Sequence, residues 1–216
     1  MSSAGFSRFL RRLLWIIPIL ALEMTYFPIK QIVSGGVAPA LWLDAYIPIW
    51  PIWGVPYLLV FGWWTFGYVW ATVCLNDENF RNFSLSGLII FSITAATFVL
   101  FPTYVNRPEL TGQGLDWDLL RFIYGNDTIY NALPSMHIST TMWITLHLVR
   151  QYPRKGWLFW GIFGIVALST LFTRQHYLLD VAAGALLAWA SLPLAGWLNR
   201  LLSPAPQPAP SRAALR

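Results

Sequence analysis

Residues 84–105 read SLSGLIIFSITAATFVLFPTYV and contain no charged side chain. A helix needs roughly 20 largely apolar residues to cross the hydrocarbon core of a bilayer, so this run predicts a membrane-spanning helix. The whole chain has the same character, because 56% of its 216 residues are hydrophobic and only 11% are charged. This composition excludes an ordinary water-soluble enzyme and indicates a membrane-embedded protein.

Other stretches of the chain are equally apolar. Together the predicted spans cover residues 9–29, 52–75, 84–105, 134–151, 156–173 and 178–202. We therefore expect an all-α fold, a polytopic bundle of six transmembrane helices that forms one domain over residues 1–202. The first span follows arginines, as in a signal peptide, but it is long and no small-residue cleavage site stands out. It is interpreted as a retained anchor.

Two segments outside the spans differ in composition. Residues 34–51 are rich in Trp, Pro and Gly and are expected to lie along the membrane interface. The Pro/Ala-rich residues 203–216 predict a disordered cytoplasmic tail. The single cysteine, Cys74, cannot form an internal disulfide and is interpreted as a small apolar residue in a helix.

The basic residues are divided unequally between the two sides of the predicted spans. Of the 14 Lys and Arg residues, Lys30, Arg107, Arg121 and Arg174 fall on one side, and the others share the side of both termini. Because cytoplasmic loops retain positive charge, both termini are predicted to be cytoplasmic in a cell membrane. The net charge of +5 includes no basic, solvated stretch, so no nucleic-acid partner is expected.

Three segments interrupt the apolar pattern with polar residues. They are NRPE at 106–109, NALPSMH at 131–137 and TRQHYLLD at 173–180. Ionisable residues in a membrane protein usually mark a functional site. By the predicted topology all three segments reach the same outer face, which would face the periplasm or the exterior.

The third segment contains a candidate nucleophile. His176 and Asp180 are four residues apart, which places them on one face of a helix. The carboxylate can accept from one imidazole nitrogen and leave the other free to attack. A structural His–Asp pair at a helix start has the same spacing. Arg174 favours catalysis, because a guanidinium can hold a phosphoryl group by two charge-assisted hydrogen bonds.

The other two segments add candidate anion-binding groups. Pro134 suits the first turn of a helix, where free backbone amides and the Ser135 hydroxyl would point towards an anion. His137 can protonate a leaving oxygen and then deprotonate an incoming one, although a structural histidine is the alternative. Arg107 adds a cation. His147 lies deeper and is expected to pack or to form an interhelical hydrogen bond.

These residues resemble the type 2 phosphatidic acid phosphatase superfamily, which comprises integral-membrane lipid phosphatases and phosphotransferases. The superfamily pattern is K-x6-R-P, then P-S-G-H, then S-R-x5-H-x3-D. The resemblance covers about residues 84–190 and looks closer to the branch that includes the inositol phosphorylceramide synthases. The matching positions are Arg107-Pro108, Pro134-Ser135-Met136-His137, and Ser169 with His176 and Asp180.

Three positions depart from that pattern. Leu100 replaces the lysine, Met136 replaces the glycine and Thr170 replaces the arginine. Arg174 lies four residues after Thr170, which on a helix is one turn along the same face. Arg174 is therefore expected to supply the missing positive charge.

The resemblance also implies a mechanism. His176 would attack phosphorus to form a phosphohistidine, with Asp180 holding its ring and His137 acting as acid and base. The nonbridging oxygens would be bound by Arg107, Arg174 and Ser135. No cofactor and no metal is implied, because arginines supply the positive charge and the His, Asp and Glu residues lack a metal-ligand spacing.

The leading hypothesis is a lipid phosphatase that acts on a phosphate ester or diphosphate of an outer-leaflet lipid, with no obligate protein partner. A lipid phosphotransferase shares the first half-reaction but uses an alcohol instead of water. A transporter is an alternative of another class, although its ionisable residues would be spread through the membrane. An intramembrane serine protease using Ser135 and His176 leaves both arginines without a role. A catalytically inactive relative is the last alternative.

Overall fold

The computed structural model describes residues 3–202, and the predicted tail at 203–216 lies outside the described residues. Within residues 3–202 the regular structure is helical and contains no strand, which confirms the all-α prediction. Short 3-10 helices η1 (Trp42–Tyr46), η2 (Pro51–Trp53) and η3 (Pro153–Lys155) join the longer elements. The α-helices are α1 (Ser3–Met24), α2 (Tyr26–Ile32), α3 (Gly54–Cys74), α4 (Asp77–Leu100), α5 (Leu115–Asn126), α6 (Met136–Gln151), α7 (Gly156–Phe172) and α8 (Leu178–Leu202).

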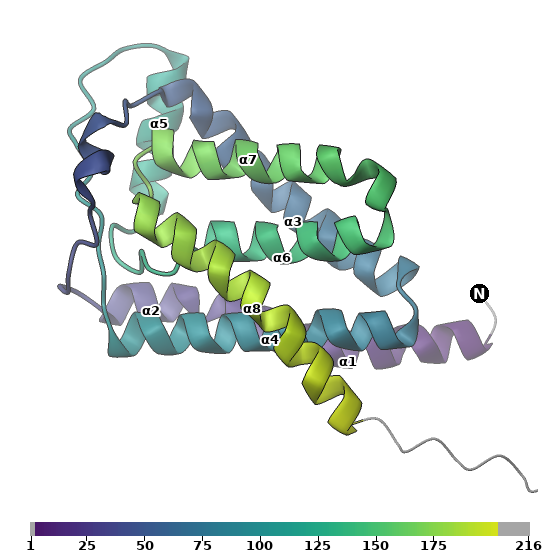
Figure 1. Cartoon of the computed structure of the whole chain (residues 1–216). Coiled ribbons are helices and arrows are strands. Elements are labelled where there is room, and N and C mark those ends of the chain that lie inside the picture. The colour runs from purple at the N-terminus through teal and green to yellow at the C-terminus, as the bar shows by residue number, and fades with distance from the viewer. Residues whose placement is uncertain (1–2, 203–216) are drawn as a thin grey trace, which may run out of the picture.

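The helices α1, α4, α6 and α7 run along one common direction, α3 and α8 cross them obliquely, and α5 lies at one end of the bundle (Figure 1). α6 is the central helix, because its successive residues 138–145 are all buried. Trp143 of α6 stacks on Phe83 of α4 with their ring centroids 4.0 Å apart. The start of α1 and the end of α8 both lie at the end of the bundle away from α5 (Figure 1).

Within residues 3–202, five helical segments are long and apolar enough to cross a membrane. They are Ser7–Ile32, Pro51–Cys74, Asp77–Leu100, Pro153–Phe172 and Leu178–Leu202. α6 has only 16 residues, fewer than the roughly 20 that a spanning helix needs. The predicted count of six spans is therefore not confirmed. The apolar residues at 134–151 predicted a membrane span, but in the structure the apolar residues of α6 are buried against neighbouring helices.

The helix that corresponds to the predicted span at 84–105 covers residues 77–100 in the structure. α4 begins at Asp77, because Asn76 caps the helix by accepting a hydrogen bond from the backbone N–H of Asn79 at 2.8 Å. The helix ends at Leu100, ahead of Pro102, since proline disfavours helical backbone in the residue before it. Arg107 therefore lies in a loop beyond the helix and not at its exit.

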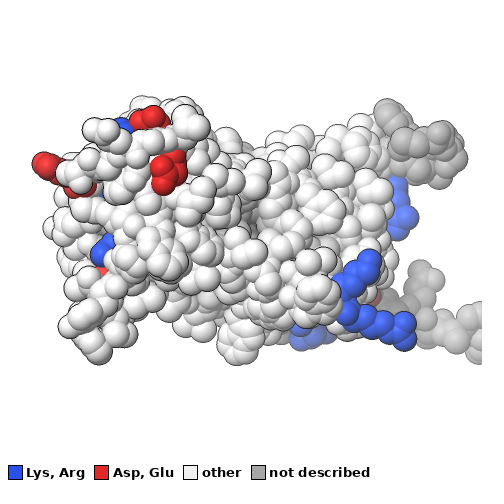
Figure 2. Space-filling model, turned by 90° about the horizontal axis from the view of Figure 1, so that it is seen from above, with Lys and Arg blue, Asp and Glu red and all other residues white. Residues whose placement is uncertain are grey.

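Charged side chains gather at the two ends of the molecule. On the face shown in Figure 2, Lys and Arg lie mainly at one end, Asp and Glu lie mainly at the other, and the belt of surface between them carries almost no charge. Large apolar side chains are exposed on the spanning helices, among them Leu14 of α1, Leu59 of α3 and Trp189 of α8. Such a belt suits the hydrocarbon of a bilayer.

Candidate active site

A cavity of about 360 Å³ lies between the α1–α2 segment and α3. Much of its wall is apolar or aromatic, with Phe61 and Trp64 on the α3 side and Met24 and Phe27 on the other. The end of α5, the start of α6 and the loop before α8 close one end. Pockets of this size accept small organic ligands or part of a lipid.

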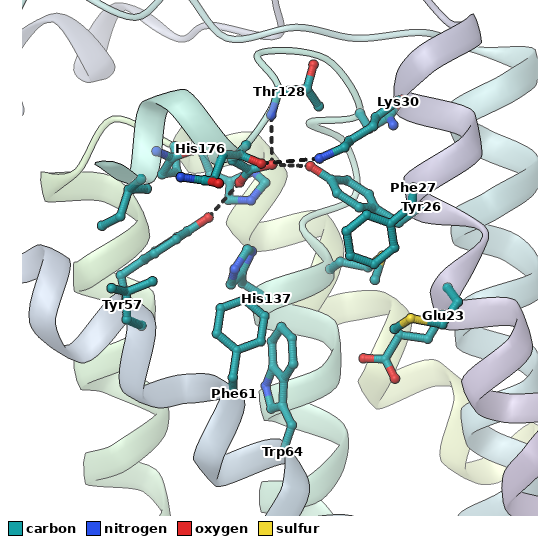
Figure 3. A pocket seen from close by; sticks show the side chains of 18 of the residues that line it. Glu23, Tyr26, Phe27, Lys30, Tyr57, Phe61, Trp64, Thr128, His137 and His176 are labelled. Atoms are coloured by element: carbon teal, nitrogen blue, oxygen red, sulfur yellow. Dashed lines mark hydrogen bonds between the residues drawn. The ribbon is translucent and has the colours of Figure 1, made fainter. Parts of the chain in front are cut away.

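His137 is the second residue of α6 and points into the cavity (Figure 3). Its ring packs against Tyr57 at a centroid distance of 4.5 Å and against Trp64 at 5.3 Å. The Nε2 atom is buried without a hydrogen-bond partner among the described residues. An unpaired buried polar atom is costly, and here it faces a cavity where a ligand atom can pair with it.

His176 lies across from His137, with the two ring centroids 5.8 Å apart. Its Nδ1 is 3.5 Å from Oδ2 of Asp180, so the two side chains are close, as predicted. They do not share a helix face, however, because α8 begins at Leu178 and His176 lies in the loop before it. Asp180 is fully buried, and the same oxygen accepts a hydrogen bond from the backbone N–H of Tyr177 at 2.8 Å. One carboxylate thus fixes the start of α8 and lies beside the Nδ1 edge of the His176 ring, although Nδ1 forms no hydrogen bond with any described residue.

Ser135 joins α6 to α8. It is the N-cap of α6, where its Oγ accepts from the backbone N–H of Ile138 at 3.4 Å, and its own N–H donates to the carbonyl of Asp180 at 3.1 Å. Pro134 therefore precedes the cap and does not occupy the first helical turn as predicted. Gly184 permits this contact, because a Cβ there would lie 2.6 Å from the Ser135 carbonyl oxygen.

Arg107 lies behind the cavity wall. Its guanidinium donates to the backbone carbonyls of Asp127 at 3.1 Å and Thr128 at 2.6 Å, and it also donates to Oε1 of Gln175. The group sits over the ring of Tyr124, 4.7 Å from the centroid. Arg107 therefore ties the loop after α5 to the residue beside His176.

Arg174 holds a different segment. The helix-face argument for Arg174 was wrong, because α7 ends at Phe172 and Arg174 has left-handed backbone with φ 53°. Its guanidinium donates to the carbonyls of Asp44 at 2.6 Å and Ile47 at 2.5 Å. Neither arginine lines the cavity, and both border a more open depression beside Asp44.

Two of the three positions that depart from the superfamily pattern, Leu100 and Thr170, lie away from the cavity. Leu100 ends α4 and is 81% exposed. The hydroxyl of Thr170 is buried and donates to the carbonyl of Ala167 at 2.8 Å within α7. Met136 opens α6 and lines the cavity beside His137.

Asp127 is a cavity residue that the sequence analysis missed. Its carboxylate accepts hydrogen bonds from the phenols of Tyr26 and, at 2.9 Å, Tyr57, so it joins α2 to α3 (Figure 3). Burial raises its pKa, but interactions with His137, Tyr26 and Arg107 outweigh burial and hold the pKa below its ordinary value. The polar triplet NDT at 126–128, which follows the apolar residues FIY at 122–124 and Gly125, was the available signal.

Two further charged residues line the cavity. Glu23 of α1 is 5% exposed and accepts a hydrogen bond from Tyr68 at 2.8 Å. Lys30 of α2 donates to the carbonyl of Asn126 at 3.2 Å, and it is the cavity's one Lys or Arg within residues 3–202. A glutamate inside a predicted span was itself a signal of function.

His147 behaves as predicted. Its Nε2 is 3.2 Å from Oγ of Ser86 on α4, and its ring lies against Phe83. The interhelical hydrogen bond is thereby confirmed. Among all the described residues, the active-site cavity included, no three His, Cys, Asp or Glu side chains are grouped so that they could hold a metal ion.

Residues 38–194 match the family model of the PAP2 superfamily. The match covers more than half of the chain and includes all three polar motifs, so this chain belongs to the PAP2 superfamily, whose members are generally phosphatases or phosphotransferases. The resemblance to type 2 phosphatidic acid phosphatases is thereby confirmed for the superfamily. Comparison with curated proteins and with solved structures gave no match.

Proposed function

We propose that this protein is a lipid phosphatase that hydrolyses a phosphate ester or diphosphate of a membrane lipid. The observation that carries the proposal is the placing of two histidines, 5.8 Å apart between ring centroids, at one end of a largely apolar cavity. A lipid phosphate matches this cavity, because it joins a polar phosphate to an apolar body. The apolar walls would hold the lipid body while the histidines act on the phosphate.

The first half-reaction transfers the phosphoryl group to His176. Nε2 attacks phosphorus, the P–N bond forms and the P–O bond to the lipid breaks. Protonated His137 gives its proton to the departing oxygen through Nε2, which has no hydrogen-bond partner in the described part of the chain. Asp180 holds the Nδ1 side of His176, where positive charge develops.

The second half-reaction releases the phosphate. Water attacks phosphorus, His137 takes a proton from that water, and the P–N bond breaks to regenerate neutral His176. The arginines add positive potential beside this end of the cavity. Arg107 donates to Gln175, and Arg174 donates to the carbonyl of Asp44, whose carboxylate accepts from the N–H of Leu178 at the start of α8. Ser135 contributes by placing His137 opposite His176.

We further propose that the protein is oriented with both termini in the cytoplasm and the cavity near the outer face of a cell membrane. The two ends of the described chain lie at the same end of the bundle, which favours an even number of passes with α6 as the sixth (Figure 1). Reporter fusions at the two termini test this orientation. Termini on opposite sides of the membrane would contradict it.

One observation favours the phosphotransferase as a second candidate, in the manner of the inositol phosphorylceramide synthases. The cavity extends from the histidines to the buried, hydrogen-bonded pair Glu23 and Tyr68. This pair has no role in the phosphatase mechanism proposed above. A carboxyl group there can accept a hydrogen bond from the hydroxyl of an alcohol. An acceptor alcohol would then replace water in the second half-reaction.

A panel of lipid phosphates tests both candidates with full-length protein in detergent. Phosphatidate, phosphatidylglycerol phosphate and an isoprenoid diphosphate are assayed for released phosphate, with and without diacylglycerol or ceramide as acceptor. Phosphate release that depends on His176 supports the phosphatase, and a new phospholipid formed only with acceptor supports the transferase. If no substrate yields either product, an inactive relative or a transporter is favoured.

A further inference from the structure

Two buried carboxamides line the same cavity as the histidines. Asn131 and Gln175 are each 4% exposed, and both belong to the cavity wall. Neither Nδ2 nor Oδ1 of Asn131 has a hydrogen-bond partner among residues 3–202, and Nε2 of Gln175 has none. Buried amide groups are nearly always paired, so unpaired ones at a cavity wall point to a ligand.

The contact with Arg107 fixes the orientation of the Gln175 amide. A guanidinium can only donate, so the atom of Gln175 that faces Arg107 must be the carbonyl oxygen. The NH₂ group is then the end without a protein partner. The charge of Arg107 polarises this amide and makes its N–H groups stronger donors. Arg107 can thus act on the cavity through Gln175, although its own terminal nitrogens are bound to carbonyl oxygens.

Asn131 has a backbone that presents its side chain at a fixed place. Its φ of 62° lies in the left-handed region, which asparagine adopts more readily than most residues. The next residues lead through Pro134 to the Ser135 cap of α6, so Asn131 is held in the segment that also positions His137. Glycine would adopt this backbone conformation equally well, so the conformation alone does not require the amide side chain of Asn131.

We propose that the carboxamides of Asn131 and Gln175 bind the substrate phosphate, each donating a hydrogen bond to a nonbridging oxygen, with Arg107 as a positioning residue behind Gln175. This inference rests on the proposed action on a lipid phosphate. It assigns oxyanion binding to neutral donors inside the cavity, while the guanidiniums of Arg107 and Arg174 hold the surrounding loops. Hydrogen bonds to a charged acceptor are strong enough for two such donors to matter.

Isosteric substitutions test the two amides separately. Asn131→Asp and Gln175→Glu keep the size of each side chain but replace the N–H donors with oxygen, and Gln175→Glu keeps an acceptor for Arg107. Asn131→Gly keeps the left-handed backbone and removes the amide. Asn79→Asp and Gln151→Glu are the matched controls, because these residues lie at the other end of α4 and α6.

The readout is binding of tungstate and of inorganic phosphate to full-length protein in detergent, measured by calorimetry in a His176→Ala background that cannot turn over. We expect each of the three cavity variants to weaken oxyanion binding about 10- to 100-fold, and each control to leave it within about twofold. Melting temperatures are measured in parallel to show that the variants are folded. Where one cavity variant unfolds, tungstate binding by the cavity variants that remain folded decides.

The outcomes separate this inference from the proposed function. If Asn131→Gly and Gln175→Glu bind tungstate as well as the controls do, the carboxamides do not bind phosphate, whether or not the protein is a phosphatase. If they lose tungstate binding while no lipid phosphate is hydrolysed, the anion site stands and the phosphatase proposal fails. No binding of either oxyanion to the parent protein overturns the inference.

Discussion

The two histidines of α6 have opposite surroundings. His137, in the first turn, faces a cavity, and its Nε2 has no partner in the described chain. His147, near the other end of the same helix, is packed against Phe83 and hydrogen-bonded to Ser86. Both side chains lie in a crowded, apolar part of the bundle. Burial alone therefore does not distinguish a catalytic histidine from a structural one, whereas an unpaired atom at a cavity does.

The largest expected effect comes from His176, which faces His137 across the cavity. His176→Ala removes the proposed nucleophile and should lower kcat for lipid-phosphate hydrolysis by at least about 10⁴-fold. Single-turnover assays with ³²P-labelled substrate should show the label on the parent protein and none on the variant. If the variant retains more than about a hundredth of the parent rate, His176 is not the nucleophile.

His137→Ala should have the next largest effect. Loss of a general acid and base typically costs about 10²- to 10⁴-fold in rate. The loss should shrink for a substrate with a good leaving group, such as a nitrophenyl phosphate ester, because that oxygen needs no proton. An equal loss for good and poor leaving groups would contradict the acid role.

Gly184→Ala tests whether the geometry of the site depends on the close contact between α8 and α6. The added Cβ would meet the Ser135 carbonyl at 2.6 Å, so the helices must separate. Overpacking of this kind costs about 1–3 kcal/mol in stability, and we expect kcat to fall with it. Gly164→Ala on α7, where no atom lies within 4 Å of the added Cβ, is the control.

Arg174→Lys should cause a smaller loss. An ammonium cannot bridge the carbonyls of Asp44 and Ile47 as the planar guanidinium does. We expect kcat/KM to fall about tenfold, because η1 and the start of α8 lose a shared anchor. Kinetics equal to those of the parent protein would show that this anchor does not support the site.

His147→Ala should have the smallest effect on turnover. It removes the hydrogen bond to Ser86 and leaves a cavity in the packing, so the free energy of unfolding should fall by about 1–3 kcal/mol. The rate of the folded protein should remain within about threefold of the parent rate, since His147 does not line the active-site cavity. A rate loss close to that of His137→Ala would erase the distinction between the two histidines.

Much of the site could be predicted because its motifs are local. The pairing of His176 with Asp180 follows from a spacing of four residues, and the apolar runs place three polar segments near helix ends. The contacts of Arg107 and Arg174 could not be predicted, because their partners come from distant loops around Thr128 and Asp44. Asp127 was missed for the same reason, since its partners Tyr26 and Tyr57 lie far away in the sequence.

The amino-acid sequence by itself determined that the chain is helical and apolar and that His176 lies close to Asp180, because hydropathy and short spacings act over neighbouring residues. Only the tertiary structure decided that α6 is a short, enclosed helix and that Glu23, Asn131 and Gln175 share a cavity with the histidines. Whether a buried polar atom is paired depends on what distant segments bring to it. That pairing is a property of the packed bundle, and it separates the residues free to bind a substrate from those that hold the helices together.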